Sequence, residues 1–94
     1  MKQMFMIAYR YRDHLDEDDL RHLTKKFVEF GEGPKPIAHY ERLDGRGGFV
    51  LREFDQEPEK VYETTVRYGS YMEFDVFPVT TMDEAFPIIS SVYG

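Results

Sequence analysis

The sequence contains no cysteine, and it has no long apolar stretch. Without cysteine the chain cannot form a disulfide framework, a thiolate zinc site or a cysteine nucleophile. No segment approaches the ~18 consecutive apolar residues of a membrane-spanning helix, and the N-terminus lacks the pattern of a signal peptide. We therefore expect no membrane association, a mature chain that equals the whole chain, and a cytoplasmic location, with which the absence of cysteine is compatible.

Positive charge is also in short supply. The chain has 12 Lys and Arg against 18 Asp and Glu, which gives a net charge of −6. This sign is wrong for a protein whose main partner is a phosphate backbone, so nucleic acid is not an expected ligand. The 94 residues suffice for a single domain spanning 1–94, and 8 Phe and 7 Tyr supply enough large apolar groups for it to fold.

Apolar periodicity and turn residues predict a βαββαβ order followed by a short helix. The expected segments are a strand at Met4–Tyr11, a helix that starts in the acidic run Asp16–Asp19 and ends before Gly31, a hairpin of Ile37–Leu43 and Gly48–Phe54, a helix from Pro58 to Gly69, a strand at Tyr71–Val79 and a helix after Thr81.

Single residues refine these expectations. Asp55 is a candidate N-cap for the second helix. Pro78 cannot donate a hydrogen bond to a neighbouring strand, so its strand should lie at a sheet edge. Thr81 and Glu84 fit a capping box, and Pro87 should kink or shorten the helix that follows.

Two split βαβ units in this order predict an α+β, ferredoxin-like four-stranded antiparallel sheet with both main helices on one face. The first strand is apolar on both sides: Met4, Met6 and Ala8 lie on one, and Phe5 and Ile7 on the other. Because helices cover only one face, the second face needs another cover. A second copy of the chain is the simplest candidate, which predicts a homodimer through the sheet face.

Three stretches carry a resemblance to a known group of proteins: MFMIAYRYRDH, DGRGGFVLREFD and YMEFDVFPVTTMDEAFPI. The chain resembles a family of short bacterial domains of unknown function in the dimeric α+β barrel superfamily. The resemblance implies a dimer whose two sheets close face to face. Such dimers include cofactor-free monooxygenases, isomerases, haem-handling enzymes and ligand binders, so the fold alone does not choose the function.

The hairpin carries the candidate catalytic pair. With a loop of Asp44 to Gly48, His39 lies opposite Glu53, and a carboxylate beside an imidazole is an arrangement used by general bases. A loop one residue shorter places His39 opposite Arg52 instead. An ordinary polar cross-strand pair is the alternative interpretation.

On the neighbouring pleat, Tyr40 is expected opposite Arg52, in a stacking pair that lines a pocket or supports the dimer surface. Tyrosines between sheet and helices supply further candidate ligand contacts, although tyrosine is also common at core edges and interfaces. The candidate ligand-binding residues are Tyr9, Tyr40, Arg52 and Tyr62.

Other motifs point to no further chemistry. Around Asp16 the acidic run lacks the glycine and glutamate of a calcium loop, and His14 and His22 lack the spacing of a helical metal pair. Gly45, Gly47 and Gly48 lack the third glycine of a dinucleotide-binding loop, and no serine stands in a nucleophile elbow. We therefore expect no metal and no cofactor.

Two functions remain. The first is a cytoplasmic homodimer that binds a small apolar or aromatic molecule, with cofactor-free catalysis as its extension. The second is a non-catalytic module that recognises another protein. A ligand-sized cavity reached by His39 or Tyr9 favours the first, whereas a filled core and an exposed apolar patch favour the second.

Overall fold

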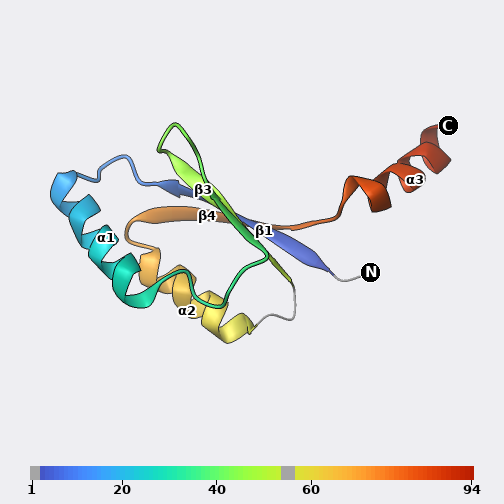
Figure 1. Cartoon of the computed structure of the whole chain (residues 1–94). Helices are drawn as coiled ribbons and strands as arrows, with labels where there is room; N and C mark the ends of the chain where they lie inside the picture. The colour runs from blue at the N-terminus through green and yellow to red at the C-terminus, as the bar shows by residue number, and fades with distance from the viewer. Residues whose placement is uncertain (1–2, 54–56) are drawn as a thin grey trace.

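A computed structural model of the chain describes residues 3–53 and 57–94 (Figure 1). Along the chain the elements are β1 (Met4–Tyr11), α1 (Glu17–Phe30), β2 (Ala38–Glu41), β3 (Gly47–Glu53), α2 (Pro58–Tyr68), β4 (Met72–Val79) and α3 (Met82–Tyr93).

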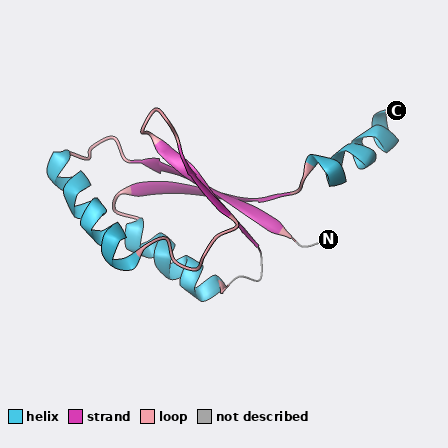
Figure 2. Ribbon diagram, in the orientation of Figure 1, coloured by secondary structure: helices cyan, strands magenta, loops and turns pink. Residues whose placement is uncertain are grey.

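The four strands form one antiparallel sheet in the order β2-β3-β1-β4. Helices α1 and α2 lie side by side on one face of it, and the other face carries no helix (Figures 1 and 2). The predicted ferredoxin-like α+β fold is therefore confirmed. So is the position of Pro78, because β4 is an edge strand and Pro78 needs no donor on its outer side.

Helix α1 begins and ends where the sequence predicts. Its N-cap, Asp16, accepts a hydrogen bond from the backbone N–H of Asp19, and the Asp19 side chain accepts one from the N–H of Asp16. Three acidic residues in the first turn face the positive end of the helix dipole. The helix ends at Gly31, which adopts a positive φ of 70°.

The hairpin register differs from the expected one. His39 pairs with Val50 and Tyr40 with Phe49, while Arg42 donates its N–H to the carbonyl of Gly47 over 2.8 Å. The turn therefore lies at residues 43–46, where Gly45 has a φ of 72°. The predicted loop of Asp44 to Gly48 is wrong.

The physical reason lies in Gly47 and Gly48, which belong to β3 rather than to the turn. A Cβ atom on Gly47 would collide with the carbonyl of Tyr9, and one on Gly48 would collide with the carbonyl of Tyr40 and the ring of Tyr9. These two positions therefore need glycine because neighbouring strands lie close to them. In the sequence, such glycines cannot be told apart from glycines of a turn.

The difference in hairpin register changes which face of the sheet each side chain lies on. His39 shares the helix-covered face with Val50, whereas Glu53 lies three positions along β3 and so on the opposite face. The predicted pairing of His39 with Glu53 is therefore wrong, and so is the alternative pairing of His39 with Arg52. The predicted pairing of Tyr40 with Arg52 is wrong for the same reason, since Tyr40 faces Phe49 on the open face.

Helix α2 starts with Pro58 in its first turn, as expected. Its N-cap is Glu57, in a left-handed conformation with a φ of 39° and without a side-chain capping bond. The proposed cap, Asp55, lies outside the described residues.

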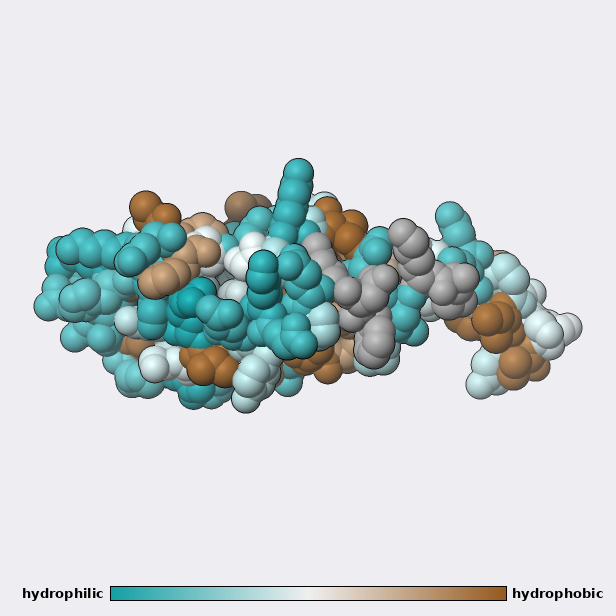
Figure 3. All heavy atoms as spheres, turned by 90° about the horizontal axis from the view of Figure 1, so that it is seen from below, coloured by the Kyte–Doolittle hydropathy of each residue, from teal (hydrophilic) through white to brown (hydrophobic). Residues whose placement is uncertain are grey.

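Helix α3 lies apart from the rest of the domain, beyond the end of β4 (Figures 1 and 2). The Thr81 side chain accepts a hydrogen bond from the N–H of Glu84, which confirms Thr81 as the N-cap. The Glu84 side chain accepts from the hydroxyl of Thr80 and not from the N–H of Thr81, so only half of the predicted capping box forms. The helix continues through Pro87 to Tyr93, so the proline does not shorten it. No residue of α3 is buried, and Figure 3 shows its hydrophobic atoms on the surface.

The core lies between the sheet and the two main helices. Ile7, Tyr9 and Val50 are buried on the helix-facing side of the sheet, and Leu23 of α1 and Tyr68 of α2 are buried against it. Within the described ranges, no helix has the length and apolarity needed to cross a membrane.

Candidate functional site

A cavity of about 380 Å³ lies between the helix-facing side of the sheet and helices α1 and α2. Most of its wall is apolar, with side chains from β1, β3, β4 and both helices. The main apolar residues are Ile7, Leu23, Phe27, Val50, Val61 and Phe74. Its volume and lining are typical of a site for a small organic molecule.

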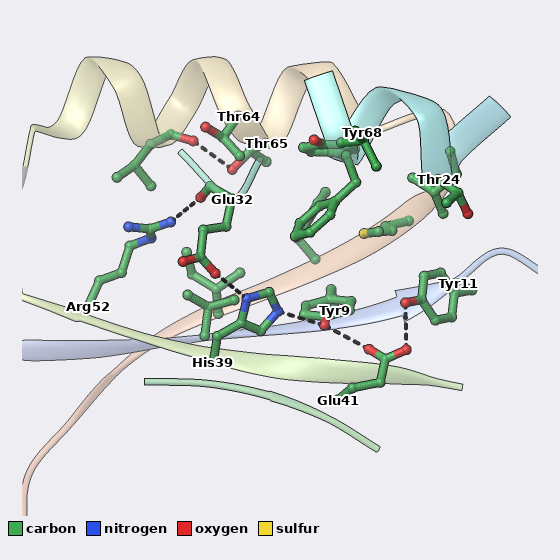
Figure 4. A pocket seen from close by; sticks show the side chains of 18 residues that line it. Tyr9, Tyr11, Thr24, Glu32, His39, Glu41, Arg52, Thr64, Thr65 and Tyr68 are labelled. Atoms are coloured by element: carbon green, nitrogen blue, oxygen red, sulfur yellow. Dashed lines mark hydrogen bonds and ion pairs between the residues drawn. The ribbon is translucent and has the colours of Figure 1, made fainter. Parts of the chain in front are cut away.

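One part of the wall is polar and forms a continuous hydrogen-bonded chain (Figure 4). Glu32 Oε2 lies 2.6 Å from His39 Nδ1, and His39 Nε2 lies 2.8 Å from the hydroxyl of Tyr9. Tyr9 donates to Glu41 Oε1 over 2.8 Å, and Tyr11 donates to Glu41 Oε2 over 2.7 Å. We call these five residues the polar chain.

The alternation of side chains along a strand places four members of the polar chain on one face of the sheet. Tyr9 and Tyr11 stand two positions apart on β1, and His39 and Glu41 stand two positions apart on β2, so each pair shares a face. Glu32 arrives separately, from the loop that follows Gly31 at the end of α1.

Counting hydrogens shows what the polar chain requires. Its four hydrogen bonds need four hydrogens, but a neutral His39 and two tyrosines supply only three while both carboxylates are ionised. Because the tyrosine hydroxyls donate toward Glu41, the missing hydrogen falls between Glu32 and His39. All four hydrogen bonds form together only if one more hydrogen stands between these two side chains. An imidazole and a carboxylate are groups used in general acid–base chemistry.

The two tyrosines keep their hydrogens. Burial, and then the hydrogen bond to the Glu41 carboxylate, raise the pKa of Tyr9 well above its ordinary value of 10.0. The same two causes raise the pKa of Tyr11. Both side chains are therefore phenols at neutral pH and act as hydrogen-bond donors.

Arg52 forms another part of the wall and is only 2% exposed. Its terminal nitrogens donate to backbone carbonyls, Nη1 to Pro34 and Nη2 to Glu32, both over 2.5 Å. Its Nε is buried and has no hydrogen-bond partner among the residues that the structure describes. Burial lowers the pKa of Arg52, and the charge of Glu32 opposes that shift. The guanidinium thus holds the loop that carries Glu32.

The structure brings together part of the predicted site. Tyr9, His39 and Arg52 all line the cavity. Tyr40 is 68% exposed on the open face of the sheet, and Tyr62 is 71% exposed on α2. These two are not among the residues that line the cavity.

Sequence reasoning missed Glu32, Glu41 and Tyr11. A signal existed for Glu41, which stands two residues after His39 on the same strand and therefore on the same face. Tyr11 has the same relationship to Tyr9. Glu32 had no such signal, because a loop brings it to His39.

The described residues include no group of three His, Asp or Glu side chains that could hold a metal ion. Two members of the acidic run, Asp16 and Asp19, cap α1 instead.

Residues 3–93 match one protein family, described as Domain of unknown function (DUF3303). None of the curated proteins matches the chain.

Proposed function

The chain belongs to the DUF3303 family, and we propose that it binds a small, largely apolar molecule in the cavity between the sheet and helices α1 and α2. The observation that carries the proposal is the composition of the wall, which is mostly apolar and holds a small number of polar groups, the polar chain among them. Ligand pockets have this character, because apolar contact provides affinity and a few polar groups orient the ligand. At about 380 Å³ the cavity accommodates a molecule of one or two rings.

The experiment that tests the binding site uses 4-methylphenol as the probe and backbone amide NMR shifts as the readout. We expect the largest shifts at cavity residues such as Leu23, Val50 and Thr65. Val61→Phe fills the cavity from α2 and should abolish binding. Val66→Phe is its matched control, because Val66 lies on the same helix and is 61% exposed.

Two results would contradict the binding proposal. One is binding by Val61→Phe that equals that of the unchanged protein. The other is a set of shifts confined to the open face of the sheet or to α3.

A second feature supports self-association. The open face of the sheet presents Met6 and Leu51 half-buried and Phe49 and Phe77 exposed, all without a covering element. The part of the chain that the structure describes offers no helix to cover them, since α3 lies apart from the sheet (Figure 1).

We propose that a second copy of the chain covers this face. Strand spacing and rise give the face a footprint of roughly 20 by 23 Å, or about 450 Å². This falls short of the ~800 Å² per partner of a standard interface. Exposed apolar side chains on α3 offer further area for the same partner: Met82, Phe86, Ile88, Ile89, Val92 and Tyr93.

Sedimentation velocity at micromolar concentration tests this assembly. A dimer supports the assembly. A monomer at all concentrations up to about 100 µM contradicts it, because a dimer dissociation constant above that value corresponds to less than ~5.5 kcal/mol of binding.

A further inference from the structure

Six hydroxyl groups line the cavity, and each directs its hydrogen at an acceptor of the protein. Figure 4 shows them on the strands and on both helices. Two belong to the polar chain and donate to Glu41. The other four donate to backbone carbonyls: Thr24 to Leu20, Thr64 to Lys60, Thr65 to Val61, and Tyr68 to Gly31.

These hydroxyls offer a ligand only the lone pairs of their oxygen atoms. A hydroxyl oxygen has one hydrogen and two acceptor positions, so a hydroxyl that has already donated can only accept from a ligand. The carboxylate of Glu32 adds to this excess, because Oε2 contacts His39 and Oε1 has no hydrogen bond among the described residues.

Donors are scarce in the same wall. Both ring nitrogens of His39 lie within hydrogen-bond distance of protein oxygens, and so do the two terminal nitrogens of Arg52. Of the described side-chain nitrogens, Arg52 Nε is a buried donor without an acceptor. The unused hydrogen-bonding capacity of the cavity is thus mostly that of acceptors.

The charges in the cavity wall also favour a ligand that donates hydrogen bonds. The two carboxylates of the wall, Glu32 and Glu41, outnumber the one guanidinium, Arg52. Even with a further hydrogen between Glu32 and His39, the wall would have no excess of positive charge to hold an anion. The remaining titratable groups of the wall are Tyr9, Tyr11 and Tyr68.

We propose that the cavity selects molecules that donate a hydrogen bond: an apolar body that carries an O–H or N–H group, with Glu32 Oε1 as its main acceptor. This deepens the proposed function and rests on it. Molecules that only accept, such as ethers, and molecules with a carboxylate should bind more weakly because their oxygens meet lone pairs.

Three probes of nearly equal shape separate these classes: 4-methylphenol, 4-methylanisole and 4-methylbenzoate. Their dissociation constants are measured by NMR titration of the unchanged protein. We expect the phenol to bind at least tenfold more tightly than the anisole, which lacks the hydroxyl hydrogen, and more tightly than the benzoate.

A variant tests the acceptor. Glu32→Ala should reduce the preference for phenol over anisole to less than threefold, while Glu29→Ala, at an exposed position of α1, should keep it. The wild-type comparison stands without this variant if Glu32→Ala fails to fold.

The outcomes separate the two proposals. Equal or tighter binding of the anisole or the benzoate in the cavity overturns the donor preference and leaves the binding site in place. Failure of all three probes to bind at millimolar concentration overturns the binding site, and the donor preference falls with it.

Discussion

His39 Nδ1 lies 2.6 Å from Oε2 of Glu32, a residue seven positions earlier in the chain. The partner expected for this histidine, Glu53, lies on the opposite face of the sheet. A carboxylate–imidazole pair therefore exists, but the loop after α1 supplies its carboxylate. The pair belongs to a chain of four hydrogen bonds, which is one more than the number of hydrogens that a neutral imidazole and two phenols supply.

Glu32→Gln should supply the missing hydrogen. The amide of glutamine donates to His39 Nδ1, so all four hydrogen bonds form with a neutral imidazole. Imidazole ¹⁵N chemical shifts of this variant should then show a hydrogen on Nε2 of His39 and none on Nδ1. A hydrogen on Nδ1 in Glu32→Gln would contradict the arrangement of the polar chain.

Alkaline titration tests the tyrosines. Because their pKa values are raised in the folded state, Tyr9 and Tyr11 should stay neutral at pH 11, where exposed tyrosines are ionised. The folded state then binds more protons than the unfolded state, so its stability falls as pH rises above 10. Phenolate absorbance near 295 nm should increase in two steps, the second accompanying unfolding. A single step with every tyrosine ionised in a folded protein would contradict this prediction.

Glycine substitutions should separate close contact from backbone strain. Gly48→Ala places a methyl group against the carbonyl of Tyr40 and the ring of Tyr9, and should cost about 3 kcal/mol or more. Gly45→Ala has open space around its Cβ, so its cost is the positive φ alone, roughly 1 to 2 kcal/mol. Urea unfolding gives both values. A Gly48→Ala variant as stable as Gly45→Ala would contradict the hairpin register described above.

Met6→Glu should dissociate the proposed dimer, because a charge on the open face would be buried without a partner. Val66→Glu is the control, since Val66 is exposed on α2, on the other side of the sheet. Sedimentation velocity should show a monomer for the first variant and a dimer for the second. Circular dichroism verifies that both are folded, and a folded Met6→Glu variant that remains dimeric would contradict the proposed interface.

Much of the fold could be predicted because its signals are local. The Met4–Tyr11 strand, the caps of α1 at Asp16 and Gly31, and the cap of α3 at Thr81 depend on residues within a few positions of one another. The edge position of β4 followed from Pro78, whose missing N–H is a property of one residue. The site was predicted only in part. Tyr9, His39 and Arg52 line the cavity as expected, but their hydrogen-bond partners Glu32 and Glu41 were not predicted.

The sequence by itself determined which segments are helices and strands and in what order they follow one another along the chain, because periodicity, caps and proline act over short distances. The tertiary structure decided the hairpin register, through the contacts of Gly47 and Gly48 with Tyr9 and Tyr40. Since side chains alternate along a strand, the three-residue difference between the predicted and the actual register exchanges the faces. This exchange of faces separates His39 from Glu53. The loop held by Arg52 places Glu32 beside His39 instead.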